Sequence, residues 1–379
     1  MKILQLVSCR GWSSDAYWAA RMAAELTRRG HTVTVAFRAG TEDRVIERAR
    51  REEGLRATVT LDLRSGLRPA SDVRDVRSLS ALLRDVDVIH VHRGKDHWLA
   101  AIANRVTRTP RPIVRTRHIT QAVRRHAANR WLYRSSTHLA VAVTDAIRRQ
   151  MIAAGLVAAD RVVTLRGGAD AERYRPGARD PELHRRLGGG AERVVIGMVS
   201  GLRSMKGHQL VIDAAASVTR RGVDARFAFV GRGPLESAVR EAIAAHDLDG
   251  RITVAGFVED LPAVMRALDI ALYVPLESEG MSRVLFECLA SGCTLVASRM
   301  GVVPEILVDE EHAMLVPAGD APSLADRLAR LVKDPDLRRR LGHAGRQLVE
   351  TRYSGAQVAA ALESHYDRLA RGVEPPRAA

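Results

Sequence analysis

The stretch that decides the fold reads Ile270-Ala-Leu-Tyr-Val274-Pro-Leu-Glu-Ser-Glu279-Gly-Met-Ser-Arg-Val-Leu-Phe-Glu287-Cys-Leu-Ala-Ser-Gly292-Cys-Thr294-Leu-Val-Ala-Ser298. The apolar run at residues 270–274 predicts a buried strand, and residues 283–291 have the apolar spacing of a helix. A second apolar run at residues 294–297 predicts another strand. A strand, a helix and a strand in this order predict a βαβ unit, whose two strands run parallel in one sheet.

The same alternation extends along the rest of the chain. In the second half, further strands are expected at residues 193–199, 226–230 and 251–255, separated by helices at 207–221 and 234–246. In the first half, strands are expected at residues 2–8, 31–37, 57–61, 86–91, 113–117 and 139–143, and helices at 15–29 and 41–53. Three helices, at residues 324–333, 335–350 and 355–371, follow the last strand. This pattern predicts an α/β fold with parallel, doubly wound sheets.

Residues 170–190 divide the chain into two such sheets. They contain Pro176, Pro181 and three consecutive glycines, which are typical of a linker, and 379 residues exceed one ordinary core. We expect a Rossmann-like domain at residues 1–172 and a second one at 173–353, facing each other across a cleft. Residues 354–379 are expected to form a helix that returns to the N-terminal domain. Ligands bind beyond the carboxyl ends of strands in such sheets, so the functional residues are sought there.

Positive charge is concentrated in the first half of the chain. The formal net charge is +15. Residues 1–170 hold 31 basic and 16 acidic residues, whereas residues 171–379 hold 28 of each. Nine arginines and no acidic residue lie between Asp96 and Asp145. This asymmetry favours an anionic partner for the first domain, and a solvated basic face is the alternative explanation.

Cysteine usage and hydropathy exclude several classes of protein. The three cysteines, Cys9, Cys288 and Cys293, have no metal-ligand spacing, and an odd count is typical of a reducing compartment. The apolar run at residues 1–7 is too short for a signal peptide, and no run approaches the roughly 20 apolar residues of a spanning helix. We therefore expect a cytoplasmic protein that is not integral to a membrane.

Two glutamates, Glu279 and Glu287, flank the start of the helix expected at residues 283–291. A helix N-terminus presents unpaired N–H groups and a partial positive charge, both of which favour a phosphate. Gly280 lets the backbone approach a ligand closely. The two carboxylates could accept hydrogen bonds from sugar hydroxyls, although the spacing alone also fits an exposed helix face.

This stretch resembles the Glu-(seven residues)-Glu motif of the retaining family-4 glycosyltransferases, which have the GT-B fold. Met281 and Ser282 replace a Phe-Gly pair of the family form. Other motifs of that family follow in the same order, and this chain carries them as Arg166-Gly-Gly-Ala-Asp170, Gly201-Leu-Arg203-Ser-Met-Lys206-Gly207, Val230-Gly-Arg-Gly-Pro234, Gly256-Phe-Val-Glu-Asp-Leu-Pro262 and Gly301-Val-Val-Pro304-Glu305. The resemblance covers nearly the whole chain and implies two Rossmann-like domains that transfer a glycosyl group.

The resemblance also implies a nucleotide-sugar site in the second domain. Arg203 and Lys206 would hold the diphosphate of a UDP- or GDP-sugar and stabilise its charge as it leaves. Glu279 would bind the donor sugar, and Glu287 the ribose. The other donor contacts implied are Phe257 and Val258, which flank the nucleobase, and Gly280, Met281 and Ser282. Because a basic pair can replace a metal ion, no obligatory metal or cofactor is expected.

The first domain is expected to bind the acceptor. His118 follows the strand at residues 113–117, and the resemblance implies that it contacts the transferred sugar. His90 and His92 end a neighbouring strand and are expected to shape the acceptor pocket, although a lone histidine is more often structural. The loop at residues 8–15 takes the place of a Gly-Gly pair of the family. It retains Gly11 and could bind phosphate through its N–H groups.

These features predict a retaining glycosyltransferase that moves a sugar from a UDP- or GDP-sugar to an envelope glycan or lipid-linked acceptor. Lipopolysaccharide, glycolipid or polysaccharide biosynthesis is the expected setting, and the basic first domain suggests a contact with the inner face of the membrane. Two alternatives stay open. One is a GT-B-like enzyme that is not a transferase, such as a nucleotide-sugar epimerase. The other is a basic nucleic-acid-binding protein, which would leave Glu279 and Glu287 unexplained and lacks the usual modules.

Overall fold

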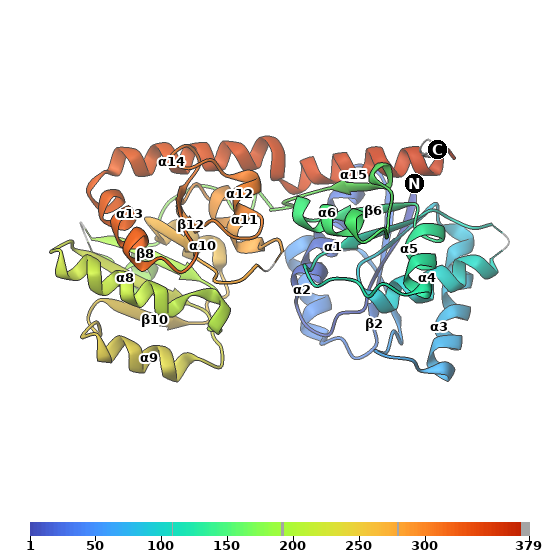
Figure 1. The fold of residues 1–379 in the computed structure, drawn as a ribbon, viewed down its shortest axis with the longest axis horizontal. Coiled ribbons are helices and arrows are strands. Elements are labelled where there is room, and N and C mark those ends of the chain that lie inside the picture. The colour runs from blue at the N-terminus through green and yellow to red at the C-terminus, as the bar shows by residue number, and fades with distance from the viewer. Residues whose placement is uncertain (108, 191–192, 279, 373–379) are drawn as a thin grey trace. The chain divides into compact units, whose positions relative to one another are not determined.

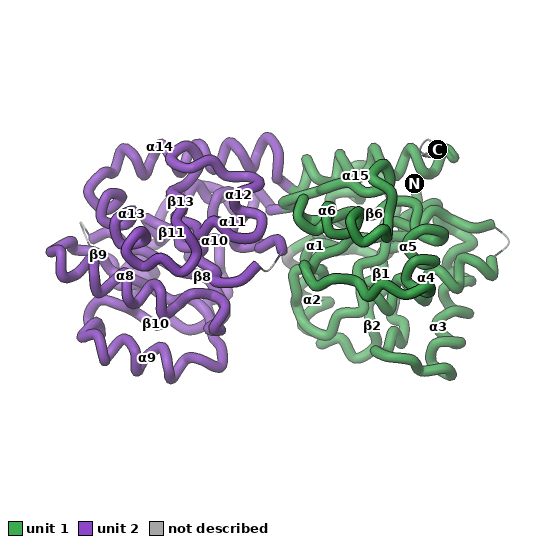
Figure 2. The backbone as a smooth tube through the Cα atoms, viewed as in Figure 1, with its two compact units in different colours: residues 1–168, 355–379 green, residues 169–354 purple. Residues whose placement is uncertain are grey.

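In the computed structural model of this protein, the chain forms two compact units (Figure 2). The structure describes all residues except 108, 191–192, 279 and 373–379. Unit 1 contains Met1–Gly168 and Gly355–Ala379, and unit 2 contains Ala169–Ser354. Each unit holds one sheet in which every strand pairing is parallel. The doubly wound α/β architecture expected from the sequence is therefore found twice.

The unit 1 sheet has seven strands in the order β3-β2-β1-β4-β5-β6-β7. Its strands are β1 (Lys2–Val7), β2 (Thr32–Arg38), β3 (Ala57–Leu61), β4 (Val88–Val91), β5 (Ile113–Arg117), β6 (Leu139–Ala142) and β7 (Val162–Thr164). Its helices are α1 (Ser14–Arg28), α2 (Asp43–Glu53), α3 (Pro69–Leu82), α4 (Gly94–Val106), α5 (Ala127–Ser135), α6 (Asp145–Ala153) and α15 (Gly355–Ala370). The direction of winding reverses between β1 and β4, where such sheets bind their ligands.

The unit 2 sheet has six strands in the order β10-β9-β8-β11-β12-β13. Its strands are β8 (Val194–Val199), β9 (Ala225–Val230), β10 (Ile252–Gly256), β11 (Ile270–Tyr273), β12 (Thr294–Ser298) and β13 (Met314–Val316). Its helices are α7 (Pro181–Arg186), α8 (His208–Arg220), α9 (Glu236–Ala245), α10 (Leu261–Ala267), α11 (Arg283–Ala290), α12 (Val303–Ile306), α13 (Ala321–Lys333) and α14 (Pro335–Leu348), with a π-turn at Val349–Tyr353. The winding reverses between β8 and β11.

The core of unit 2 shows why an aromatic-poor chain folds this way. Central strand β8 is buried at every position, as expected for a parallel strand covered on both faces. Aliphatic residues such as Ile196, Ile270 and Val296 fill the core with Phe227 and Phe229. Because these strands are buried, their side chains cannot contact a ligand. Ligands of such sheets bind at the loops beyond the carboxyl ends of the strands.

The C-terminal helix α15 packs on α1 of unit 1, and Figure 2 draws both in one colour. Tyr366 of α15 is fully buried. Near its middle, the Glu363 carboxylate accepts hydrogen bonds from Arg29 (2.6 Å) and from His31 (2.7 Å) at the end of α1. Helix α15 is thus an integral layer of unit 1 (Figure 1).

The segment expected to be a linker is only partly irregular. Helix α7 begins at Pro181 inside it, and the Asp180 carboxylate caps that helix by accepting from the N–H groups of Glu182 and Leu183. Pro at the first helical position and Asp before it are typical of a helix start. Pro181 therefore marks the start of a helix within unit 2.

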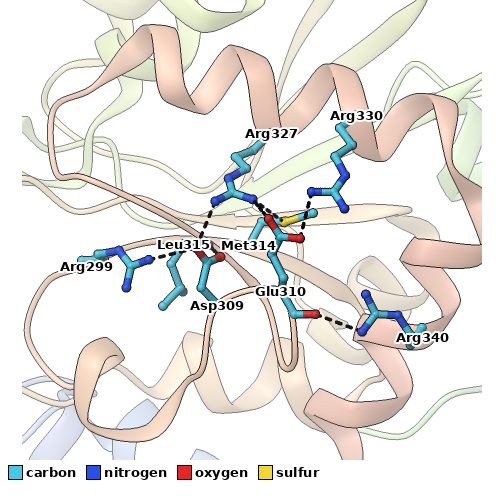
Figure 3. Close-up of polar contacts among 8 residues, drawn as sticks. All are labelled: Arg299, Asp309, Glu310, Met314, Leu315, Arg327, Arg330 and Arg340. Atoms are coloured by element: carbon cyan, nitrogen blue, oxygen red, sulfur yellow. Dashed lines mark hydrogen bonds and ion pairs between the residues drawn. The ribbon is translucent and has the colours of Figure 1, made fainter.

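A polar network in unit 2 holds the turn before β13 (Figure 3). Asp309 accepts hydrogen bonds from Arg299 (2.9 Å) and Arg327 (3.0 Å). Glu310, whose φ is +60°, pairs with Arg327 and with Arg330 (2.9 Å) on α13. The network joins the end of β12, the turn and α13.

None of the helices described here is at once long and apolar enough to span a membrane.

Candidate functional site

The loops at the carboxyl edge of the unit 2 sheet are hydrogen-bonded to one another through their backbones. The loop after β8 contacts those after β9 and β11, and the loop after β9 contacts the end of β10. The bonds are Leu202 N to Arg232 O (3.2 Å), Gly231 N to Gly256 O (2.8 Å) and Leu276 N to Met205 O (2.8 Å). Side chains carried by these loops are therefore held in fixed positions relative to one another.

Glycines make this close approach possible at two positions. Gly207 has a φ of +86°, and a Cβ there would collide with the carbonyl oxygen of Val274 after β11. Gly231 has a φ of +149°, and a Cβ there would collide with the carbonyl oxygen of Ser200 after β8. Both backbone conformations favour glycine. These two glycines of the predicted motifs thus act by letting the loops pack.

Arg203 and Lys206 lie on one short turn that leads from β8 into α8. The backbone N–H of Lys206 donates to the carbonyl of Arg203 (3.0 Å), closing the 3₁₀ turn Ser204–Lys206. The Arg203 side chain is exposed and that of Lys206 is half-buried. Helix α8 begins at His208, immediately after. The turn therefore brings two cations to the N-terminus of a helix, where an anion is favoured.

The loop between β11 and α11 carries the next group of predicted residues. Glu279 lies outside the described residues. Gly280 has a φ of +79°, and its carbonyl oxygen is 3.2 Å from where a Cβ on Gly301 would lie. Met281 and Ser282 are buried, and Ser282 is the N-cap of α11. The loop thus approaches the one after β12 and ends at a second helix N-terminus.

Glu287 lies one turn into α11 and has no exposed surface. Arg283, four residues earlier, places its Nε 3.1 Å from Glu287 Oε1. The buried carboxylate therefore contacts Arg283 and lies next to Tyr174. Burial and the nearby Glu287 charge raise the pKa of Tyr174, which therefore stays protonated beside the carboxylate.

Phe257 and Val258 follow β10 at the same edge of the sheet. Phe257 is 56% exposed, which is unusual for a large apolar side chain. Val258, the next residue, is half-buried. An exposed ring on a loop fixed by the Gly231–Gly256 bond can stack on a flat ligand.

In unit 1, three histidines gather at the carboxyl ends of β4 and β5. The rings of His90 and His92 stack at 4.5 Å, and His92 Nδ1 lies 3.1 Å from His118 Nε2. Trp18 of α1 contacts all three, with ring centroids 5.7 to 5.8 Å apart. The structure therefore joins the three predicted histidines into one cluster.

Hydrogen bonds from three elements hold the histidine cluster. His90 Nε2 lies 2.6 Å from the hydroxyl of Thr116 on β5, and His90 Nδ1 contacts the hydroxyl of Tyr366 on α15. His92 Nε2 lies 3.1 Å from the side-chain oxygen of Gln5 on β1. His90 and His92 are fully buried. Burial depends on how distant segments pack, so the sequence alone could not separate a structural role from a ligand-binding role.

Burial sets the charge of this cluster. It lowers the pKa values of His90 and His92 well below the usual range. Burial also lowers the pKa of His118 to about 4, even though the negative charge of Asp15 acts in the opposite direction. All three imidazoles are therefore neutral at pH 7 and can donate or accept hydrogen bonds without adding charge.

Arg93 and Asp15 form an ion pair beside this cluster. Arg93 Nη2 donates to Asp15 Oδ1 at 3.1 Å and to Ser13 Oγ at 3.3 Å. Burial would raise the pKa of Asp15, but the hydrogen bond from Arg93 and the positive charges around it hold that pKa below its usual range. Asp96, which accepts from the backbone N–H of Arg93 (2.9 Å), caps α4.

Gly11, the remaining predicted residue, lies on the loop between β1 and α1. It lines a hollow of about 490 Å³ at the carboxyl edge of the unit 1 sheet, together with Arg10, Arg38 and Arg93. Unit 1 therefore presents two neighbouring environments, a neutral imidazole cluster and an arginine-lined hollow.

Several residues of these sites were not identified from the sequence. The spacing of Arg283 and Glu287 on one helix face was an available signal. No local signal marks the Arg93–Asp15 pair or the Tyr366–His90 contact, whose members lie 78 and 276 residues apart. Within the described part of the chain, no group of three or more His, Cys, Asp or Glu side chains is placed to hold a metal ion.

Comparison with known proteins identifies the family. Residues 16–173 match the model described as Glycosyltransferase Family 4, and residues 180–348 match the model described as Glycosyl transferases group 1. The phosphatidyl-myo-inositol mannosyltransferase of Mycobacterium leprae is 31% identical over 297 residues, which are 76% of this chain and 74% of that protein. This chain belongs to the family-4 glycosyltransferases. The family membership expected from the order of the motifs is thus confirmed.

Two further comparisons bear on the extent of the likeness. The alpha-D-kanosaminyltransferase of Streptomyces kanamyceticus is 31% identical over 237 residues, which are 59% of this chain and 60% of that protein. Several curated relatives are matched over only 46 to 60% of their length. Anabaena HepE, solved in complex with UDP, has a TM-score of 0.81 at 20% identity, covering 97% of this chain and 100% of that one. This likeness confirms the GT-B fold.

Proposed function

We propose that this family-4 glycosyltransferase moves a sugar from a UDP- or GDP-sugar to an envelope glycan or lipid-linked acceptor, with retention of the anomeric configuration. Unit 2 would bind the donor and unit 1 the acceptor. The observation that carries the proposal is the interlocked edge of unit 2, where Arg203 and Lys206 share one turn and α11 begins on an adjoining loop. That edge combines cations, helix N-termini and glycines, which is the chemistry a diphosphate requires.

The two cations would divide the work on the diphosphate. The planar guanidinium of Arg203 can hold two oxygens at once, whereas Lys206 supplies a compact point charge. The N–H groups at the start of α11, next to Gly280 and Ser282, would add donors that carry no counter-charge. UDP is the favoured nucleotide because HepE, with the same fold, was solved with it.

The remaining donor contacts follow from the same edge. Phe257, with Val258 beside it, would stack on the nucleobase. Glu287 would accept hydrogen bonds from the ribose hydroxyls, a role that the resemblance of its motif to the family supports. Glu279 would bind the donor sugar. Met281 would complete the donor pocket.

The chemistry proposed is attack from the face that the nucleotide leaves. The bond between the anomeric carbon and the diphosphate oxygen breaks, and the acceptor oxygen bonds to that carbon. The proton of the acceptor hydroxyl passes to the departing diphosphate, whose charge Arg203 and Lys206 stabilise. His118, neutral at pH 7, would hold a hydroxyl of the transferred sugar by a hydrogen bond. No metal ion is required by this scheme.

A surface of unit 1 supports an acceptor presented at the inner face of a membrane. Helix α4 exposes Ile102 and Val106, and Trp98 on the same helix stacks on Trp131 of α5 at 5.7 Å. Exposed arginines lie on the same two helices and on the loop before α5, namely Arg105, Arg124, Arg125 and Arg130, and we call this region the α4–α5 surface. Apolar and basic side chains on one surface suit the interface of an anionic leaflet. The name of the relative from M. leprae also specifies a phospholipid acceptor.

The test of this function is release of the nucleotide. Wild-type protein with UDP-sugars, GDP-sugars and a panel of lipid and glycan acceptors should release UDP or GDP only when an acceptor is present. Lys206→Ala should lower turnover by about 100-fold or more, because a charge that stabilises the leaving group is lost. Lys333→Ala, at an exposed position at the end of α13, is the matched control. Interconversion of the donor sugar without nucleotide release would instead support an epimerase.

A further inference from the structure

The arginine-lined hollow of unit 1 is not used by the chemistry proposed above. Its walls come from the loop after β1, from the last residue of β2 and from the residue that precedes α4. Each of these segments contributes one arginine, namely Arg10, Arg38 and Arg93. Three guanidinium groups therefore converge at the carboxyl ends of three adjacent strands.

The positive charge of the hollow is only partly neutralised. Arg93 is paired with Asp15. Arg38 donates to the hydroxyl of Ser65 (3.1 Å), and its buried Nε has no hydrogen-bond partner among the described residues. The exposed Arg10 side chain has no hydrogen bond or ion pair within the described part of the chain. Two of the three arginines thus keep donors available.

The carboxylate of Glu42, beside this loop, does not remove this excess. Glu42 lies near Gly11, and its carboxylate is paired with Arg44. Burial and the positive charges of Arg10, Arg64 and Arg93 lower the pKa of Arg38, which reflects how closely these cations crowd one another. Like charges held this close are unfavourable unless an anion joins them.

We propose that this hollow, the arginine pocket, binds a phosphate group of the acceptor. The proposal rests on the function proposed above and adds a chemical class to its acceptor. Arginine forks match the geometry of phosphate oxygens. A volume of about 490 Å³ also accommodates more than a bare phosphate, so the group to which it is attached fits as well.

The acceptor is favoured over the donor as the source of this phosphate. The donor diphosphate has its own cations, Arg203 and Lys206, in unit 2. Trp12 lines the arginine pocket, with Arg48 stacked on its ring at 5.3 Å. An indole beside a phosphate site suits the ring or chain of a phosphorylated sugar, polyol or lipid headgroup.

The experiment is calorimetric titration of the full chain at low ionic strength with inorganic phosphate, glycerol 3-phosphate and glycerol. Both phosphates should bind and glycerol should not. Arg10→Gln should weaken phosphate binding about tenfold or more, because a charge-assisted contact is lost. Arg77→Gln, an exposed arginine on α3, removes the same charge elsewhere in unit 1 and should bind as the wild type does. Arg38→Lys keeps the charge but loses the fork, and should give an intermediate loss.

Titration of the same proteins with UDP separates this proposal from the proposed function. UDP binding should be equal in the wild type and Arg10→Gln. Absence of UDP binding would count against the proposed function alone. The arginine pocket is disproved if neither phosphate binds, if Arg10→Gln and Arg77→Gln behave alike, or if Arg10→Gln weakens UDP as much as phosphate. Vesicles with and without phosphatidate then distinguish the sources, since a lipid headgroup predicts a preference for phosphatidate that Arg10→Gln removes.

Discussion

For single residues, the proposed role of each charged group depends on what its side chain contacts. Lys206 and Arg203 sit on an exposed turn and can reach a ligand, whereas Glu287 is buried against Arg283. The two kinds of residue need different tests. Loss of Lys206 should change donor binding and chemistry, while loss of Glu287 should change packing as well as binding.

Analogues of the nucleotide separate these two effects at Glu287. Wild-type protein should bind UDP about tenfold or more tightly than its 2′-deoxy or 3′-deoxy analogue, because a hydrogen bond to a carboxylate is lost. In Glu287→Gln that preference should shrink, since a neutral amide accepts a weaker bond. Calorimetry measures both ratios. A Glu287→Gln protein that is less stable but keeps the full preference for UDP would show that the carboxylate is structural.

The sequence predicts which residues lie together when those residues belong to ordered motifs. Arg203, Lys206 and Gly280 could be predicted together because their motifs follow one another along the chain, and the structure places them on adjoining loops. Side-chain pairing between distant segments was out of reach. Arg93 meets Asp15 only because β1 and β4 are neighbours in the sheet, and strand order is not written in local periodicity.

Among the secondary-structure elements, the histidines at the carboxyl ends of β4 and β5, which are neutral at pH 7, predict a pH-dependent stability. Below pH 6.5 the unfolded chain binds protons on these imidazoles, whereas the folded protein does not protonate His118 until about pH 4. Stability should therefore fall as the pH falls from 6.5 to 4. His118→Gln should show a shallower fall in melting temperature across this window. Parallel pH profiles for the two proteins would contradict the assignment of a neutral His118 with a lowered pKa.

The turn before β13 offers a second test at this scale. Arg327 contacts both Asp309 and Glu310, and its side chain is only 26% exposed. Arg327→Ala should lower the free energy of unfolding by about 1 kcal/mol, since it breaks a network rather than an isolated pair. Arg339→Ala removes the highly exposed pair with Asp336 and should cost less than about 0.5 kcal/mol. Urea unfolding compares them, and equal midpoints would show that the network adds nothing.

Prediction of elements from the sequence succeeded where apolar runs were long. Strands such as β8 and helices such as α8 fall within a residue or two of their expected bounds. Strands β7 and β13 have three residues each, too few to show a period, and were not predicted. Helix α7 was hidden because its prolines and the neighbouring glycines suggested a linker. Pairing to an existing sheet edge, rather than propensity, forms such short strands.

At the scale of the whole molecule, the two units differ in charge as their proposed roles require. The excess of +15 lies in residues 1–170, and the α4–α5 surface and the arginine pocket account for part of it. The remaining chain is balanced, which suits a unit that binds its nucleotide through a few placed cations. The net charge alone does not distinguish the α4–α5 surface from the arginine pocket. Each of the two is therefore tested with its own variants.

Membrane contact through the α4–α5 surface gives a prediction at this scale. The wild type should sediment with anionic vesicles at low salt and much less with neutral ones. Arg124→Gln with Arg125→Gln should weaken this about tenfold or more, because each basic residue near an anionic surface contributes about 1 kcal/mol. Arg186→Gln with Arg220→Gln removes the same charge from unit 2 and serves as the control. Equal recovery with anionic and neutral vesicles would exclude this surface as a membrane contact.

Calorimetric titration with UDP and GDP is the direct test of whether the edge of unit 2 binds a nucleoside diphosphate sugar. One nucleotide should bind per chain, with an affinity about tenfold or more lower in Arg203→Gln, because a charge-assisted contact with the diphosphate is lost. Arg221→Gln, an exposed arginine just beyond α8, should leave the affinity unchanged. Failure of both nucleotides to bind, or equal affinity in the wild type and Arg203→Gln, would contradict the claim.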